Sequence, residues 1–139
     1  MKYYSDSIKY DFKLSLLLDK IRSNRDNYFP NESFNSFDSF ITKTLGMSRS
    51  WVTQHIKSGK IYKILLDYKE IEEIKLPLRI THLKGIPFDG TESNKREIIE
   101  IWKKACASTS PSLPTARVVK RTALDYFHER SNIPFSHIR

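Results

Sequence analysis

The chain has 139 residues, of which 39% are hydrophobic and 29% are charged, with a mean hydropathy of −0.51. This length fits one ordinary domain or two very small ones. No run approaches the roughly 20 apolar residues that a transmembrane helix needs. The first residues lack the apolar segment of a signal peptide. We therefore expect no membrane partner and a cytoplasmic or nuclear location.

Metal binding and catalysis are not expected from the residue types. Cys106 is the single cysteine, which excludes a disulfide within the chain, and we expect it to be buried. The four histidines are scattered without the spacing of a zinc site. Asp125, His128 and Glu129 fall on the predicted last helix, but no nucleophile or glycine-rich loop accompanies them to form a pocket. We expect no metal, no cofactor, no small-molecule substrate and no enzyme activity.

The positive charge is unevenly distributed. Lys and Arg outnumber Asp and Glu by 24 to 16, a net charge of +8, and the pI is near 9.6. Residues 39–66 contain no acidic residue, whereas acids gather in 67–73 and 92–100. The acid-free window carries five cations, Lys43, Arg49, Lys57, Lys60 and Lys63. A local positive field of this kind favours nucleic acid as a partner.

Helical periodicity dominates the chain. The first helix is predicted over residues 7–25, where apolar residues recur at helical spacing, preceded one turn earlier by Tyr10. They are Leu14, Leu17, Leu18 and Ile21. The segment 28–31 contains Pro30 and breaks this helix, because proline disfavours helix in the residue before it.

Three short helices are predicted next. The first has Phe37, Phe40, Ile41 and Leu45 inward, an N-cap at Asn35 or Ser36, and an end at Gly46. The second begins after the cap Ser48, buries Val52 and Ile56, and stops at Gly59. The third carries Ile61, Ile64, Leu65 and Tyr68 at helical spacing.

The second half of the chain also reads as helical. A short helical segment is expected over residues 79–84, and Thr91 precedes an amphipathic helix that buries Ile98, Ile101, Trp102 and Ala105. Residues 108–114 form a linker by composition. Thr115 caps a last helix over residues 116–130, with Val119, Ala123, Tyr126 and Phe127 inward, and the tail from Ser131 is expected to fray.

The predicted fold is therefore all-α, with about six helices. We divide the chain into a DNA-binding domain with flanking helices (1–107), the linker (108–114), and a C-terminal helix with its tail (115–139).

Residues 37–57 have the pattern of a helix-turn-helix. Two short helices that cross steeply need a tight turn, and Gly46 supplies the residue that adopts positive φ at least cost. Apolar residues stand where the two helices must pack together, namely Ile41, Leu45, Met47, Val52 and Ile56.

The outer face of the second of these helices is polar and basic. Arg49, Ser50, Thr53 and Gln54 are predicted to contact base edges in the major groove, since Arg and Gln make bidentate contacts to guanine and adenine. Phosphate contacts are predicted for Lys43, Ser48, Lys57, Lys60 and Lys63. A second basic patch on the last helix is either a solvated face or a clamp on the DNA backbone; it consists of Arg117, Lys120 and Arg121.

The segment Leu45-Gly46-Met47-Ser48-Arg49-Ser50-Trp51-Val52-Thr53 resembles the helix-turn-helix of ParB- and KorB-type partition proteins. The stretches 76–83, 99–105 and 113–119 are similar to segments that follow this motif in ParB-like phage and plasmid proteins. The likeness covers roughly residues 34–120. No ParB-type N-terminal nucleotide-binding domain precedes it, so nucleotide hydrolysis and clamp formation are not carried over.

The resemblance implies operator or centromere-like binding, in plasmid or phage partition or in transcriptional control. It places the DNA contacts on Ser48, Arg49, Ser50, Thr53, Gln54 and Lys57. We expect a homodimer, because readers of near-palindromic operators are usually dimeric. The expected location is the nucleoid in a prokaryotic cytoplasm, or the nucleus in a eukaryote.

Two other functions remain open at this stage. One is a protein-interaction module that displays Trp51, Tyr62 and Tyr68 on the same scaffold without touching DNA. The other is RNA binding, which lacks the aromatic and glycine surface of RNA-recognition modules. Trp51 itself is expected in the core, with contact to a DNA sugar-phosphate as the alternative, and Trp102 is expected in the core.

Overall fold

The computed structural model describes residues 2–24, 37–43 and 45–138, and these residues are all-helical, with no strand among them. The predicted fold class is confirmed, with five α-helices and one short 3-10 helix instead of about six helices. The elements are α1 (Lys2–Ser23), α3 (Phe37–Lys43), α4 (Arg49–Lys69), η1 (Ile80–Leu83), α5 (Glu92–Thr109) and α6 (Ala116–Ile138). The predicted break at 28–31 and the predicted caps Asn35 and Ser36 lie outside the described residues.

The long helix α4 replaces two of the predicted helices. Gly59 was expected to end a helix, but it lies buried in the middle of α4. It lies against Ser15 of α1, and a Cβ at position 59 would come within 2.5 Å of the Ser15 Cβ. Glycine is therefore present at this position to let two helices approach closely. The prediction that Gly59 ends a helix was wrong, because the residue lacks a side chain for the sake of tertiary packing and not of local backbone conformation.

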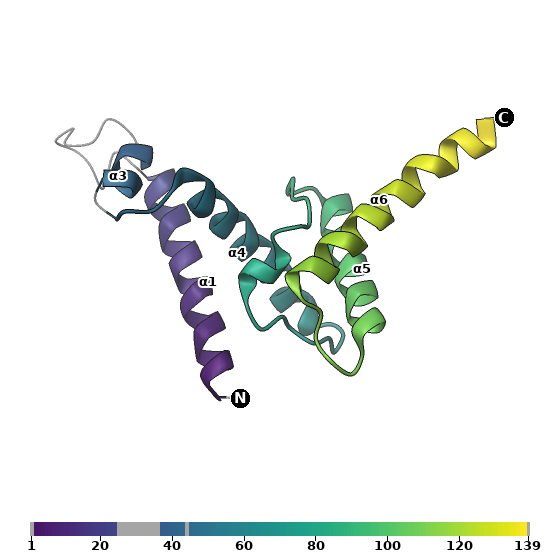
Figure 1. The fold of residues 1–139 in the computed structure, drawn as a ribbon, viewed down its shortest axis with the longest axis horizontal. Helices are drawn as coiled ribbons and strands as arrows, with labels where there is room; N and C mark the ends of the chain where they lie inside the picture. Colours follow the sequence, from purple (N-terminus) through teal and green to yellow (C-terminus); the bar gives the residue numbers. More distant parts are fainter. Residues whose placement is uncertain (1, 25–36, 44, 139) are drawn as a thin grey trace.

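The helix α4 runs from α1 and α3 toward α5 and α6 (Figure 1), and it contributes to two hydrophobic clusters. The smaller one joins α1, α3 and the first two turns of α4; its buried members are Leu18, Ile41, Val52 and Ile56. The larger one joins the start of α1 and the rest of α4 with η1, α5 and α6, and its central residues include Ile61, Leu65, Leu83, Ile101 and Trp102. Because α4 contributes to both clusters, it connects the N-terminal and C-terminal parts of the molecule.

The buried face of α1 differs in part from the predicted stripe. Leu18 is buried and Leu14 and Ile21 pack beside it, as predicted. Leu17, however, is 51% exposed and Tyr10 is more exposed still. The buried face includes Ile8 and Ser15, because α4 approaches α1 at the Ser15–Gly59 contact.

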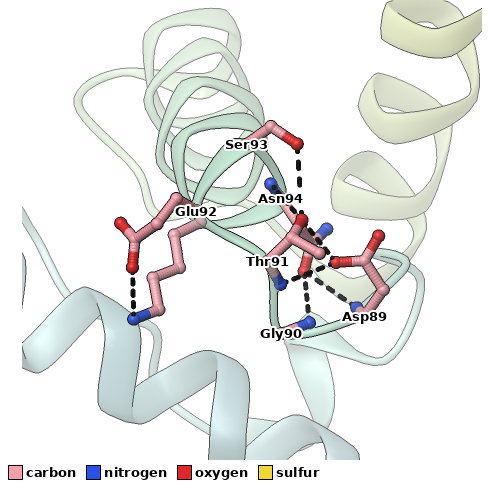
Figure 2. Close-up of polar contacts among 7 residues, drawn as sticks. Asp89, Gly90, Thr91, Glu92, Ser93 and Asn94 are labelled. Carbon is pink, nitrogen blue, oxygen red and sulfur yellow. Dashed lines mark hydrogen bonds and ion pairs between the residues drawn. The ribbon is translucent and has the colours of Figure 1, made fainter.

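The start of α5 is held by a network of side-chain hydrogen bonds (Figure 2). The Thr91 hydroxyl oxygen accepts a hydrogen bond from Asn94 N at 3.1 Å, which confirms Thr91 as the cap. Asp89 Oδ1 accepts from Thr91 N at 2.8 Å, and this bond is the main cause of a lowered pKa for Asp89. The buried Asn94 side chain accepts from Asp89 N and donates to Pro87 O. The bond from Asn94 N satisfies one free amide of the helix start, and the other bonds hold the preceding loop against it.

The predicted core of α5 and α6 is confirmed. The four inward residues predicted for α5 are all buried, and Trp102 Nε1 donates a hydrogen bond to Lys75 O at 2.7 Å. Thr115 Oγ1 accepts from Val118 N at 3.3 Å, as expected of a cap. Beyond Arg130, where the sequence led us to expect a frayed tail, α6 continues to Ile138 and extends away from the other helices (Figure 1).

Candidate nucleic-acid interface

The connection between α3 and α4 is a short turn with one residue at positive φ. Gly46 has φ of +66°, the conformation expected from the sequence. Two backbone hydrogen bonds close the turn, from Leu45 N to Phe40 O (3.4 Å) and from Met47 N to Ile41 O (2.9 Å). A Cβ at position 46 would meet no atom within 4 Å, so glycine is favoured here by its positive φ and not by a lack of space for a side chain.

Ser48 caps α4 as predicted. Its hydroxyl oxygen accepts a hydrogen bond from Trp51 N at 3.1 Å, while its backbone is extended. One of the four amides that a helix start leaves without an intrahelical acceptor is thereby satisfied.

The inner side of the first turns of α4 packs against α3 and α1. Val52 and Ile56 are buried against Ile41 and Leu18, and Met47 is partly buried beside them. Leu45 was expected in this contact but is 41% exposed. Because α3 ends at Lys43, Leu45 no longer follows the apolar stripe of that helix.

Four polar side chains lie together on the outer side of the same turns, and all four are exposed. We call them the recognition face: Arg49, Ser50, Thr53 and Gln54. They are the residues that the sequence singled out for base contacts. Helical spacing separates them from Val52 and Ile56, which are buried, so they can be substituted without opening the core.

The five predicted phosphate ligands fall into three groups. Lys43 and Ser48 are exposed at the turn, next to the recognition face. Lys57 is partly buried and donates a hydrogen bond to Lys84 O at 3.1 Å, and burial lowers the pKa of its ammonium group.

The other two lysines form ion pairs further along α4. Lys60 Nζ lies 3.8 Å from Asp19 Oδ1, and Lys63 Nζ lies 2.7 Å from Asp67 Oδ1. Nearby carboxylates thus compete with a phosphate at these two positions.

The position of Trp51 was predicted wrongly. Its side chain is 42% exposed, and it stacks on the His55 ring, with centroids 4.5 Å apart and planes at 17°. His55 is buried, and its Nε2 lies 2.9 Å from Asp11 O of α1. The spacing of one helical turn between Trp51 and His55, and the place of His55 beside Ile56, were the signals in the sequence for this stack.

The second basic patch lies on the first turns of α6. Arg117, Lys120 and Arg121 are all exposed. The stem of Lys120 lies against Gly85, where a Cβ would come within 2.6 Å of the Lys120 Cβ. The Cα and Cβ of Lys120 thus pack against Gly85, while the residue as a whole is exposed. This arrangement is compatible with both interpretations, a solvated face and a backbone clamp.

The remaining candidates carry no visible site. Asp125, His128 and Glu129 are exposed on α6. Cys106 is half-buried, and burial raises the pKa of its thiol. Within the described ranges, no group of three or more metal-ligating side chains is gathered. None of the described helices has the length and apolar character needed to cross a bilayer.

Comparisons with protein-family models, curated proteins and solved structures find no match to this chain. The similarity to ParB- and KorB-type proteins therefore depends on the motif residues alone. The geometry of α3, the turn and α4 supports the functional proposal independently.

Proposed function

We propose that this protein binds double-stranded DNA in a sequence-specific manner, with α3, the turn and α4 acting as a helix-turn-helix. In this proposal the first two turns of α4 enter the major groove. Arg49 and Gln54 contact base edges, Ser50 and Thr53 support them, and Lys43 and Ser48 hold phosphates. Lys57, Lys60 and Lys63 add positive charge along the same helix.

One observation carries the proposal: the start of α4 is apolar on one side and polar on the other. Val52 and Ile56 are buried against α1 and α3, and the recognition face is fully on the exposed side. No acidic residue occurs in residues 39–66, so nothing on this segment itself repels a phosphate backbone. Exposed Trp51 adds an aromatic surface beside these residues, in reach of a sugar or base.

The biological role that follows is plasmid or phage partition, or transcriptional control. Both need a dimeric reader of paired half-sites, so we propose a homodimer acting on DNA in the cytoplasm, or in the nucleus of a eukaryotic source. The alternative, a protein-interaction module on the same scaffold, loses one of its three aromatic residues, because Tyr62 is buried.

Selection from a pool of random duplex oligonucleotides tests the proposal. The full chain should enrich a defined site, and a palindromic site would indicate a dimer. The double variant Arg49→Ala/Gln54→Ala is the matched control, and it should enrich no site. A wild-type pool that remains random after several rounds, with the protein folded, contradicts sequence-specific binding.

A further inference from the structure

A groove of 570 Å³ lies between α4 and α5, beyond the recognition face. Its lining is mainly apolar and includes Leu16 of α1, Ile64 of α4, Ile71 in the turn after α4, Phe88, and Ile99 of α5. Leu16 and Ile71 are 51% and 82% exposed. Apolar side chains this exposed at a groove, rimmed by charged groups, are typical of an interaction site.

Two helical stripes form the groove. On α4 the lining residues Lys60, Ile64 and Tyr68 recur at steps of four, and Ile71 follows in the turn after the helix. On α5 the residues that line the groove, among them Lys95 and Ile99, follow the same spacing. From Lys60 to Tyr68 the stripe on α4 spans nine residues, about 13 Å of helix. With Ile71 beyond the helix end, the apolar groove fits an amphipathic helix of about three turns.

The charges around the groove favour an acidic occupant. Its lining contains four cations and two carboxylates, Asp67 and Glu92. Lys63 pairs with Asp67 on α4, and Lys95 pairs with Glu92 at 3.2 Å on α5 (Figure 2). The two remaining cations of the lining are Lys60, 5.8 Å from the Phe88 ring centre, and Arg96, which forms no ion pair with any described residue. Lys60 also lies 3.8 Å from Asp19, but this carboxylate is shared with Arg22 at 3.1 Å. The lining residues therefore carry a net charge of +2.

We propose that the α4–α5 groove binds an amphipathic helix of a partner protein, whose apolar stripe is flanked by glutamates or aspartates. Leu16, Ile64 and Ile71 receive the apolar stripe, and Lys60 and Arg96 pair with the acidic flanks. The basic segment 39–66 of a second copy would fit the groove poorly, because the cations of the lining repel it. The groove follows the recognition face along α4, so the partner helix would sit beside bound DNA, but the proposal does not depend on DNA binding.

A designed peptide tests this proposal with the full chain. The probe is a fluorescein-labelled, end-capped helix of about 14 residues, with leucines at i, i+4, i+7 and i+11 and glutamates elsewhere. Its counterpart has lysines in place of the glutamates. Fluorescence anisotropy should show saturable binding of the glutamate peptide, at least about tenfold tighter than binding of the lysine peptide.

Two variants and one control locate the binding. Ile71→Asp should weaken binding of the glutamate peptide about tenfold, and Arg96→Glu should weaken it while tightening the lysine peptide. Leu124→Asp is the matched control, because Leu124 is exposed on α6 and lies outside the groove lining. Circular dichroism and melting temperature should confirm that each variant is folded.

Several results would overturn the proposal. They are equal affinity for the two peptides, no binding of the glutamate peptide, and binding that Ile71→Asp and Arg96→Glu leave unchanged. Loss of a homodimer in the Ile71→Asp variant, seen by sedimentation, would show that a second copy occupies the groove. Displacement of the peptide by phosphatidylglycerol vesicles would assign the groove to a lipid surface instead.

Discussion

Gly59 of α4 and Ser15 of α1 lie so close that no larger residue fits at position 59. A Cβ there would come within 2.5 Å of the Ser15 Cβ and closer still to its hydroxyl oxygen. Ser15 cannot swing away easily, because its hydroxyl donates a hydrogen bond to Phe12 O at 2.7 Å and its side chain is buried. This contact limits how closely α1 and α4 can approach each other.

The first prediction follows from that contact. Gly59→Ala should lower the free energy of unfolding by roughly 1–3 kcal/mol, the usual cost of overpacking, although alanine favours an unconstrained helix by about 1 kcal/mol. Ser15→Gly should recover part of the loss in the Gly59→Ala background, since it removes both clashing atoms. Urea denaturation of the wild type, the two single variants and the double variant measures the coupling free energy between the two substitutions. Strictly additive effects of the two substitutions would show that the contact is not the cause.

The second prediction separates the two sides of the start of α4. Arg49→Ala and Gln54→Ala should change the free energy of unfolding by no more than about 0.5 kcal/mol, because both side chains are exposed. Each should reduce the preference for the selected DNA site over random DNA by roughly 1–3 kcal/mol. Competition binding and thermal melting give the two quantities.

Val52→Ala is the opposite case and serves as the control. Its side chain is buried between α3 and α1, so truncation should lower the free energy of unfolding by roughly 1–3 kcal/mol. At temperatures where the variant is folded, its preference for the selected site should persist. Unchanged specificity in both Arg49→Ala and Gln54→Ala would mean that another surface contacts the bases.

The third prediction concerns salt. If about five phosphates are neutralised, the logarithm of the binding constant should fall with a slope of roughly −4 to −5 against the logarithm of salt concentration. Lys43→Ala should reduce this slope by about one. Lys69→Ala, at the far end of α4, is the matched control and should leave it unchanged. A binding constant that is insensitive to salt would be inconsistent with an electrostatic contact to DNA.

The fourth prediction concerns pH and His82 of η1. Burial and the nearby Arg79 lower the pKa of this imidazole. The unfolded chain therefore takes up the proton near pH 6.5, while the folded chain does so only at lower pH. The free energy of unfolding should be highest above about pH 6.5 and should decrease as the pH falls below it.

Urea denaturation at several pH values measures this effect, from about 1.5 units below to about 1 unit above the ordinary histidine pKa. His82→Gln should weaken the pH dependence, because the glutamine does not titrate. An NMR titration of the His82 ring gives its pKa in the folded protein directly. A folded-state pKa at or above the ordinary value would contradict the prediction.

Local signals in the sequence were sufficient for several features of the fold. Gly46 has the positive φ that its place between two apolar stripes predicted. Ser48, Thr91 and Thr115 accept the hydrogen bonds expected of helix caps. These features depend on residues within a few positions of each other, so the conformational preference of one residue decides them.

The candidate interface was predictable from the sequence only in part. The stripe spacing of α4 correctly separated the buried Val52 and Ile56 from the exposed Arg49 and Gln54. It did not predict the exposure of Trp51, which adjoins the buried face and whose burial depends on how far α3 and α1 cover it. Nor did it predict that Lys60 and Lys63 would lie beside carboxylates at a groove.

Composition and periodicity by themselves determined that this protein is all-helical and basic, with its positive charge concentrated on one segment. Only the tertiary structure decided the role of Gly59, the exposure of Leu17 and Trp51, and the groove between α4 and α5. The physical reason is that a helical period identifies the residues that share a face. Whether that face is buried depends on another helix, whose approach is set by residues far away in the chain.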